Sequence, residues 1–370
     1  MRVERLQLTS FRSYESLDVS FPSGPQVVVG ANATGKTNLL ESLVVLGTSR
    51  SHRASADAEL ITWAADFARL EAALEGDNRV EVVMARSSAG GGRKRVLVNG
   101  VPRRPSALAV ALPVVLFAPE DMLLVVGSPS GRRNSLDMLI VQTVPAAAAT
   151  MSTYGRALTQ RNNLLRAIRE NAAAPDELHY WDDVILENGT QIVDWRRAAL
   201  AQLAESLSAA HQEIAPGEEL LRMDYLTNAP PLAGETTRDA LRRRLIDTRE
   251  KEMWNGATLI GPHRDDVVFV SGDRDLSTFA SRGQQRTAIL AYKLAQLEML
   301  TLVAGQPPLL LLDDVFSELD PDRRAHLVRR IGDLPQAFVS TTTTDDLDPA
   351  LVAASTVWEV APGKLTRGIR

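Results

Sequence analysis

The sequence predicts an α/β protein in which a mainly helical segment interrupts a sheet-containing domain. Three observations along its 370 residues support this prediction. Apolar runs with strand periodicity dominate the first third, helical periodicity fills the middle, and strand–helix alternation returns at the end. The simplest architecture is an α/β domain formed by residues 1–118 and 254–370, with a helical lobe of residues 119–253 inserted in it.

The first third reads as strands separated by turns. Residues 3–8 alternate apolar and polar positions, and residues 27–29 form a β-branched run that ends in glycine. Residues 79–84 and 95–98 flank the glycines at 90–92, a pattern typical of a hairpin. We therefore expect strands at these four segments.

Three further segments are apolar throughout, as the buried strands of a parallel sheet require. They are residues 114–117, 309–312 and 337–339. Between them, residues 178–214 carry apolar side chains at helical spacing, with a possible break at Gly189. Either Thr236 or its neighbour Thr237 could cap another helix that runs to about residue 252.

The composition is typical of a soluble globular protein, with 45% hydrophobic and 24% charged residues. No uninterrupted apolar run approaches the roughly 20 residues of a membrane span. The N-terminus lacks the apolar centre of a signal peptide, and cysteine is absent, which excludes disulfides. We expect a cytoplasmic protein with no membrane contact.

The net charge of −5 argues against a generally basic surface, but a local basic stripe would be enough to bind nucleic acid. Arginine is clustered at residues 132–133, 196–197, 242–244, 323–324 and 329–330. Most such clusters are solvated helix faces. The densest, at 242–244, is a candidate for DNA contact.

A glycine-rich segment between an apolar strand and a helix fits the phosphate-loop (Walker A) pattern at every fixed position. It reads Gly30, Ala31, Asn32, Ala33, Thr34, Gly35, Lys36 and Thr37. Glycines allow backbone N–H groups to converge on a β-phosphate at the positive end of the helix. Lys36 would reach the β- and γ-phosphates, and the Thr37 hydroxyl would bind Mg²⁺. The segment predicts ATP binding.

Four leucines followed by Asp313 and Asp314 have the form of a Walker B strand. Asp313 would complete the Mg²⁺ shell if its strand is next to that of the phosphate loop. Asp314 would point to the other side of the chain and polarise the attacking water, so it is the candidate catalytic residue. Paired acids after a strand are also common at helix starts, so this motif by itself is only a moderately specific sign of a nucleotide site.

A segment resembling the ABC signature precedes Asp313 by 32 residues. Ser281, Gly283 and Gln284 match it, while Arg282 stands where a glycine is usual. A D-loop-like segment, residues 317–320, follows the Walker B strand. Together the motifs resemble an ABC-type (P-loop) ATPase head interrupted by a mainly helical lobe.

That resemblance implies a homodimer closed by ATP, because the signature of one subunit covers the nucleotide of the other. Transporters of this class carry a histidine after the next strand, where Thr341 is the best candidate here, and glutamate at the position of Asp314. Both departures imply slow ATP hydrolysis.

The Walker A lysine and the Walker B aspartate are 277 residues apart, since they occupy positions 36 and 313. This spacing is too wide for a transporter subunit, our second candidate. A third candidate, an SMC-like tether, would need a far longer coiled coil with sustained heptads.

Longer strings, above all GPHRDD and LLDDVFSELD, resemble the RecF family, and the matches extend from about residue 6 to 345. The matching segments are 11–14, 30–38, 49–53, 119–121, 127–129, 132–133, 160–162, 261–266, 280–287 and 311–320. Ala33, where many ABC heads have glycine, also occurs in this family. His263 by itself would suit a polar turn.

The resemblance implies an ATP-dependent DNA-binding protein of recombinational repair, DNA replication and the SOS response. It would bind single-stranded DNA or single–double-strand junctions at gaps and help RecA loading with RecO and RecR. It also implies nucleotide contacts for Arg12, at a phosphate, and for His52 and Arg53, near the base. Without the resemblance, these two neighbours would pass for a surface loop.

Overall fold

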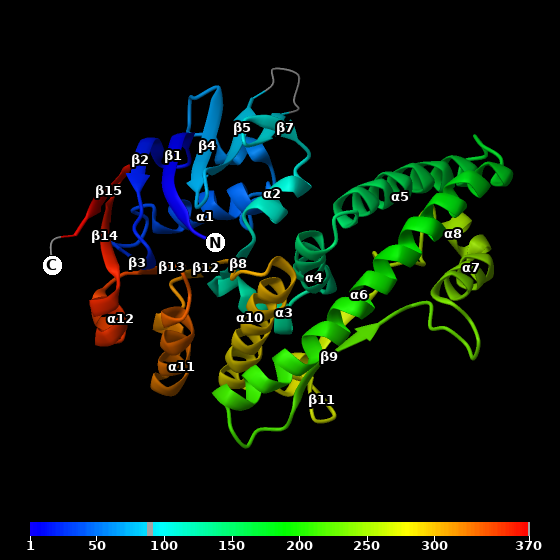
Figure 1. Cartoon of the computed structure of the whole chain (residues 1–370). Helices are drawn as coiled ribbons and strands as arrows, with labels where there is room; N and C mark the ends of the chain where they lie inside the picture. Colours follow the sequence, from blue (N-terminus) through cyan, green and yellow to red (C-terminus); the bar gives the residue numbers. More distant parts are fainter. Residues whose placement is uncertain (87–91, 369–370) are drawn as a thin grey trace. The chain divides into compact units, whose positions relative to one another are not determined.

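The computed structural model describes residues 1–86 and 92–368, which fold into two compact units (Figure 1). The first unit comprises Met1–Met122, Ser206–Glu218 and Arg282–Arg370, and the second Leu123–Glu205 and Glu219–Ser281. Both units are assembled from segments far apart in the sequence.

These units differ from the expected lobes in three segments, the shortest of which is residues 119–122, which belong to the first unit and not to the helical one. Residues 254–281 belong to the helical unit because β10 (Asp266–Ser271) pairs with β9 (Leu221–Leu226). Residues 206–218 belong to the first unit, where Glu213 lies 3.1 Å from the Arg330 guanidinium. For the two longer segments, pairing across the sequence, rather than composition, sets the boundary.

Two six-stranded sheets form the first unit within the described residues. The antiparallel sheet has the order β2-β1-β4-β5-β6-β7. Its strands are β1 (Val3–Phe11), β2 (Tyr14–Ser20), β4 (Phe67–Leu74), β5 (Asn78–Ala85), β6 (Arg93–Val98) and β7 (Val101–Arg103). The other sheet has the order β15-β14-β3-β13-β12-β8 and is parallel apart from β15. Its strands are β3 (Gly24–Val29), β8 (Val114–Phe117), β12 (Leu309–Asp313), β13 (Gln336–Thr341), β14 (Thr356–Ala361) and β15 (Lys364–Arg367).

Every strand expected from the sequence lies inside one of these strands. Strands β5 and β6 pair antiparallel, as the hairpin pattern predicts. Most of the glycine turn between them, residues 90 and 91, lies outside the described residues.

Helix α1 (Lys36–Thr48) lies between the two sheets and shares one core with both. Gln336 joins the sheets by accepting a hydrogen bond from the Val3 backbone N–H (2.8 Å) and donating one to its carbonyl (3.0 Å). The remaining helices and 3-10 turns of this unit are α2 (Ser106–Ala111), α10 (Arg282–Ala304), α11 (Pro321–Gly332), α12 (Pro349–Ala354), η1 (Asp57–Leu60), η2 (Pro119–Met122), η4 (Phe316–Glu318) and η5 (Thr344–Asp346). Leu309 and Leu311 of β12 sit in this core, which fixes where Asp313 emerges.

Helix α10 is long and apolar enough to cross a membrane by composition. However, 72% of its most apolar window is buried inside the protein. It therefore has the character of a core helix.

The second unit is mainly helical. Its elements are α3 (Leu123–Val126), α4 (Pro129–Thr143), α5 (Ala147–Arg169), η3 (Pro175–Glu177), most of α6 (Leu178–Ile214), β9, α7 (Thr237–Asp247), α8 (Arg249–Asn255), β10, β11 (Arg274–Asp275) and α9 (Leu276–Phe279). Thr236 caps α7 by accepting the Asp239 N–H, as one of the two expected alternatives. The expected helix to residue 252 is divided at Thr248 into α7 and α8.

The possible break at Gly189 is wrong, because α6 runs through it without interruption. A Cβ at this position would lie 3.2 Å from the Tyr154 ring and 3.4 Å from Pro262. The glycine therefore allows close packing inside an uninterrupted helix.

A buried polar network organises the second unit. The Arg161 side chain, 1% exposed, donates to Asp182 (2.8 Å), Glu252 (2.7 Å) and the Thr258 hydroxyl (2.9 Å). Asn162 accepts from both the backbone N–H and the hydroxyl of Thr258.

The GPHRDD segment, residues 261–266, forms hydrogen bonds and an ion pair with other segments of the second unit. The His263 ring accepts the Tyr154 hydroxyl at Nδ1 (2.7 Å) and donates from Nε2 to the Thr258 carbonyl (3.2 Å). Asp266 forms a two-pronged ion pair with Arg132, with distances of 2.9 and 2.8 Å. The described contacts of the segment are therefore those of a scaffold.

Candidate nucleotide-binding site

The phosphate loop connects β3 to α1, as expected. The Gly30 N–H donates to the Thr341 carbonyl (3.3 Å), which ties the start of the loop to β13. Ala33 and Gly35 have positive φ angles of 65° and 115°. A Cβ on Gly35 would lie 2.9 Å from the Ser13 hydroxyl, so the loop needs glycine for space as well as conformation.

The Lys36 side chain lies inside the bend of this loop. Its ammonium donates to the carbonyls of Gly30 (2.7 Å) and Ala31 (3.0 Å). Burial lowers the pKa of Lys36, and the carboxylates of Asp314 and Asp313 oppose that shift. The Lys36 ammonium, which contacts the loop carbonyls and interacts with two carboxylates, is suited to bind a polyanionic ligand.

Asp313 reaches the loop although its strand is not next to β3. Strand β13 lies between them and places Ser340 directly beside Asp313. The Asp313 carboxylate accepts hydrogen bonds from the hydroxyls of Ser340 (2.6 Å) and Thr37 (3.2 Å). Sequence reasoning missed Ser340, although it precedes Thr341, the residue that was selected on that strand.

Asp314 has a positive φ of 52°, a conformation that aspartate tolerates better than most residues. Its backbone N–H donates to both the carbonyl (3.2 Å) and the hydroxyl (3.0 Å) of Ser340. The strand ends one residue earlier, so simple alternation does not describe the direction of this side chain. The Asp314 carboxylate raises the pKa of Lys36 and so opposes the lowering by burial.

These residues fit a triphosphate with Mg²⁺. Thr37 and Asp313 offer a hydroxyl and a carboxylate oxygen, which are hard ligands of the kind that Mg²⁺ accepts. Within residues 1–86 and 92–368, no group of three or more His, Cys, Asp or Glu side chains could hold a metal ion. A metal at Thr37 and Asp313 would therefore need further oxygens from phosphates and water.

Arg12 lies near α1 but its guanidinium is engaged by protein groups. It forms a two-pronged pair with the fully buried Glu41 (2.9 and 2.8 Å) and donates to the Glu59 carbonyl (3.0 Å). Burial would raise the pKa of Glu41, but hydrogen bonds from Arg12 and Ser51 hold it below its ordinary value. The phosphate contact of Arg12 stays a prediction.

His52 is half-buried, and both of its ring nitrogens lack a hydrogen-bond partner among the described residues. Burial lowers the pKa of His52, opposed by the carboxylates of Glu41, Glu120 and Asp313. A ring whose two nitrogens lack partners fits a ligand contact, while Arg53 is exposed to solvent.

The other selected residues lie where the motifs predict. Ser281 directly precedes α10, and Gly283 and Gln284 lie in its first turn. The Thr341 hydroxyl donates to the Thr343 carbonyl (2.8 Å), within its own turn. Their contacts to nucleotide stay predictions.

A phosphate loop between a parallel and an antiparallel sheet, with a helical lobe inserted before the signature, defines the ABC-type ATPase head. Two solved SMC heads bound to domains of ScpA share this fold over at least 95% of either chain, with TM-scores of 0.54 and 0.52 at 16% identity.

The chain matches the family described as RecF/RecN/SMC N terminal domain over residues 2–361. It is 39% identical to the DNA replication and repair protein RecF of Halalkalibacterium halodurans, over 99% of this chain and 100% of that one. Its identity to the RecF of Bacillus subtilis is 37%, with the same coverage. A solved structure of the recombination mediator RecF with ATPrS matches with a TM-score of 0.89 at 28% identity, covering 100% of this chain and 98% of that one. The chain belongs to the RecF family.

Proposed function

We propose that this chain is an ATP-dependent DNA-binding protein of recombinational repair. The observation that carries the proposal is the group of Thr37, Asp313 and Ser340 beside the Lys36 ammonium. ATP binds there with Mg²⁺ and joins two copies of the chain through the signature at Ser281, Gly283 and Gln284.

The family relationship supports the repair role. Relatives at 39% and 37% identity are named DNA replication and repair proteins, and RecF has been solved with ATP as part of the RecFOR pathway. By this relationship the chain binds single-stranded DNA or single–double-strand junctions at gaps. It works there with RecO and RecR to help RecA loading in the cytoplasm, as part of DNA replication and the SOS response.

Each site residue has a defined task in this proposal. Lys36 binds the terminal phosphates, Thr37 and Asp313 hold Mg²⁺, and Asp314 orients a water and accepts its proton. Bound Mg²⁺ supplies positive charge that offsets the phosphate oxygens. Because Asp314 stands where transporters carry glutamate, hydrolysis is slow, and ATP acts mainly as a gate. Arg12, His52, Arg53 and Thr341 complete the nucleotide pocket.

The test is the fluorescence anisotropy of a labelled gapped duplex, titrated with protein in the presence and absence of ATP and Mg²⁺. We expect ATP to tighten DNA binding at least tenfold in the wild type and to have no effect in Lys36→Ala. Direct titration with labelled ATP should show that Lys36→Ala has lost most nucleotide affinity. Wild-type affinity for ATP in this variant would contradict the site.

A further inference from the structure

One segment of the chain has a charge opposite to that of the whole. Residues 82–119 contain six basic residues and no acidic one, in a chain of net charge −5. The basic residues are Arg86, Arg93, Lys94, Arg95, Arg103 and Arg104. A local excess of this kind is the feature that phosphate binding requires, whatever the net charge.

The arginine clusters noted in the sequence are mostly engaged elsewhere. Members of these clusters form ion pairs with acidic side chains of their own unit. These pairs are Arg132–Asp266, Arg196–Asp137, Arg243–Glu235, Arg244–Asp247, Arg323–Asp320 and Arg330–Glu213. Two members of the densest cluster, Arg243 and Arg244, are therefore part of the scaffold of the second unit.

The strand register places two of the basic residues on the outer face of the antiparallel sheet. Val96 is buried and packs on the core, so its neighbour Arg95 points the other way, and so does Arg93. Arg93 pairs across the sheet with Ala85, and Arg95 with Val83. Both arginines are exposed.

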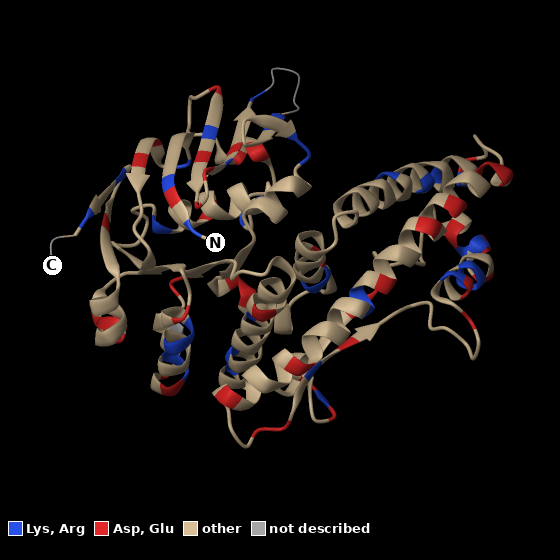
Figure 2. Ribbon diagram, viewed as in Figure 1, with Lys and Arg blue, Asp and Glu red and all other residues tan. Residues whose placement is uncertain are grey.

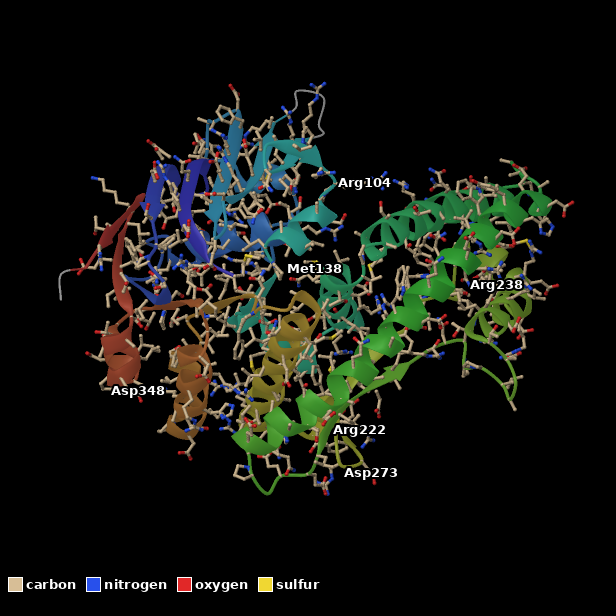
Figure 3. All side chains as sticks on the ribbon, in the orientation of Figure 1. Arg104, Met138, Arg222, Arg238, Asp273 and Asp348 are labelled. Atoms are coloured by element: carbon tan, nitrogen blue, oxygen red, sulfur yellow. The ribbon has the colours of Figure 1, made fainter. Side chains whose placement is uncertain are left out.

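Two further arginines extend this surface to the edge of the sheet. Arg103 ends β7, the edge strand, and Arg104 follows it, before α2 (Figure 3). Both are exposed, and basic residues gather on this edge in Figure 2. We call Arg93, Arg95, Arg103 and Arg104 the edge arginines.

The edge arginines have no acidic or hydrogen-bonding side-chain partner among residues 1–86 and 92–368. Lys94, between two of them, differs: it points inward and donates to the Ser49 carbonyl (2.6 Å) and to Asp57 (2.5 Å). Four exposed guanidiniums without counter-charges are free to neutralise phosphates.

We propose that the edge arginines bind the phosphate backbone of duplex DNA. The inference rests on the proposed function and assigns its DNA contact to one surface. A duplex fits better than a single strand because single-strand sites stack bases on successive aromatic side chains. Residues 68–116 contain no aromatic residue at all. An exposed aromatic, Phe67 in β4, pairs with Ala85, the cross-strand partner of Arg93, but β6 and β7 themselves offer charge without a series of stacking side chains.

The experiment compares three double variants of the full chain, each of which removes two positive charges. They are Arg93→Gln/Arg95→Gln, Arg103→Gln/Arg104→Gln and the control Arg238→Gln/Arg274→Gln, whose exposed arginines lie in the second unit (Arg238 in Figure 3). Anisotropy with labelled duplex and with single-stranded DNA is measured across a salt series at saturating ATP.

We expect each edge variant to lose about tenfold or more in duplex affinity. The slope of log affinity against log salt should fall by about one for each arginine that contacts a phosphate. The control should bind duplex as the wild type does, and all three variants should keep wild-type affinity for labelled ATP.

Several outcomes would overturn the inference. Wild-type duplex affinity and salt slope in both edge variants would refute it while leaving the proposed function intact. A loss of single-strand binding with duplex binding unchanged would refute the assignment to a duplex. If the wild type binds neither DNA at any ATP concentration, the proposed function itself fails.

Discussion

At the scale of single residues, Asp313 is the group that the fold holds most firmly at the site. It is 5% exposed and accepts hydroxyl hydrogen bonds from two different elements, Thr37 at the start of α1 and Ser340 in β13. A carboxylate fixed from two sides loses little freedom when it binds a metal ion. Its neighbour Asp314 is held by its backbone N–H, so its carboxylate is oriented by a turn rather than by a strand.

The variant Asp314→Asn separates binding from hydrolysis. It keeps the shape of the side chain but removes the group that accepts a proton, so steady-state ATP hydrolysis should fall by about 100-fold or more. Affinity for labelled ATP should stay within about threefold of the wild type, since the change leaves Lys36 and Thr37 intact. Hydrolysis near the wild-type rate would show that another group activates the water.

The residues of this site were predictable only where a local motif contains them. The phosphate loop and Asp313 are marked by spacing along the chain, and the structure brings Lys36, Thr37 and Asp313 together. Ser340 was missed because its role depends on the pairing of β12 with β13, which the sequence does not specify. For the same reason the buried Glu41, which holds Arg12, carried no signal of its own.

At the scale of elements, the second unit depends on ion pairs as well as on its apolar core. Arg161 on α5 connects α6 to α8 through Asp182 and Glu252, and Glu252 also accepts the Leu259 N–H (2.7 Å). Glu252 is fully buried. The three elements are therefore tied at one point, where a single substitution has a large effect.

Removing that guanidinium should destabilise the protein strongly. Arg161→Ala leaves the Glu252 carboxylate buried without its partner, which should cost about 3–5 kcal/mol of unfolding free energy. The control Arg156→Ala, at an exposed position of the same helix, should change it by less than about 0.5 kcal/mol. Urea unfolding followed by circular dichroism measures both, and equal stability of the two variants would show that the pair is dispensable.

His263 should make the stability of this unit depend on pH. Burial lowers the pKa of His263 from 6.5 to about 4. Below pH 6.5 the unfolded chain thus binds a proton that the folded chain excludes, so the unfolding free energy falls as pH drops toward 4 and is unaffected above that window. The full effect is on the order of 3 kcal/mol.

Thermal unfolding at pH 7.5 and pH 5.0 tests this dependence. His263→Gln should lose less in Tm between the two values than the wild type, because glutamine does not titrate. The half-buried His52 and the buried His211 and His326 also have lowered pKa values, but they contribute equally to both proteins. Equal pH dependence in both would exclude His263 as the source.

Strong periodicity predicted the elements of the core well, and long-range contacts explain the exceptions. The leucines of β12 and the alternation of β1 lie in strands as expected. Gly189 reads as a helix breaker by propensity, but packing against Tyr154 overrides it. Strand β9 was not recognised inside the helical lobe because it exists through its pairing with β10.

At the scale of the whole molecule, we propose that dimerisation couples the nucleotide site to the DNA surface. The first unit contains the phosphate loop, the Walker B strand and the edge arginines. A net charge of −5 gives a monomer little general attraction for DNA. Two copies of the basic edge in one dimer would bind DNA more tightly than a single copy does. We therefore propose that ATP controls DNA binding by setting whether two of these basic edges are brought together in one dimer.

Sedimentation velocity of the full chain, with and without ATP and Mg²⁺, tests this coupling directly. We predict a monomer without nucleotide and a dimer with it. The variant Ser281→Arg should stay monomeric with ATP while keeping wild-type affinity for labelled ATP, because the signature acts on the nucleotide of the other copy. The same sedimentation coefficient with and without ATP, in a protein that binds ATP, would contradict the account.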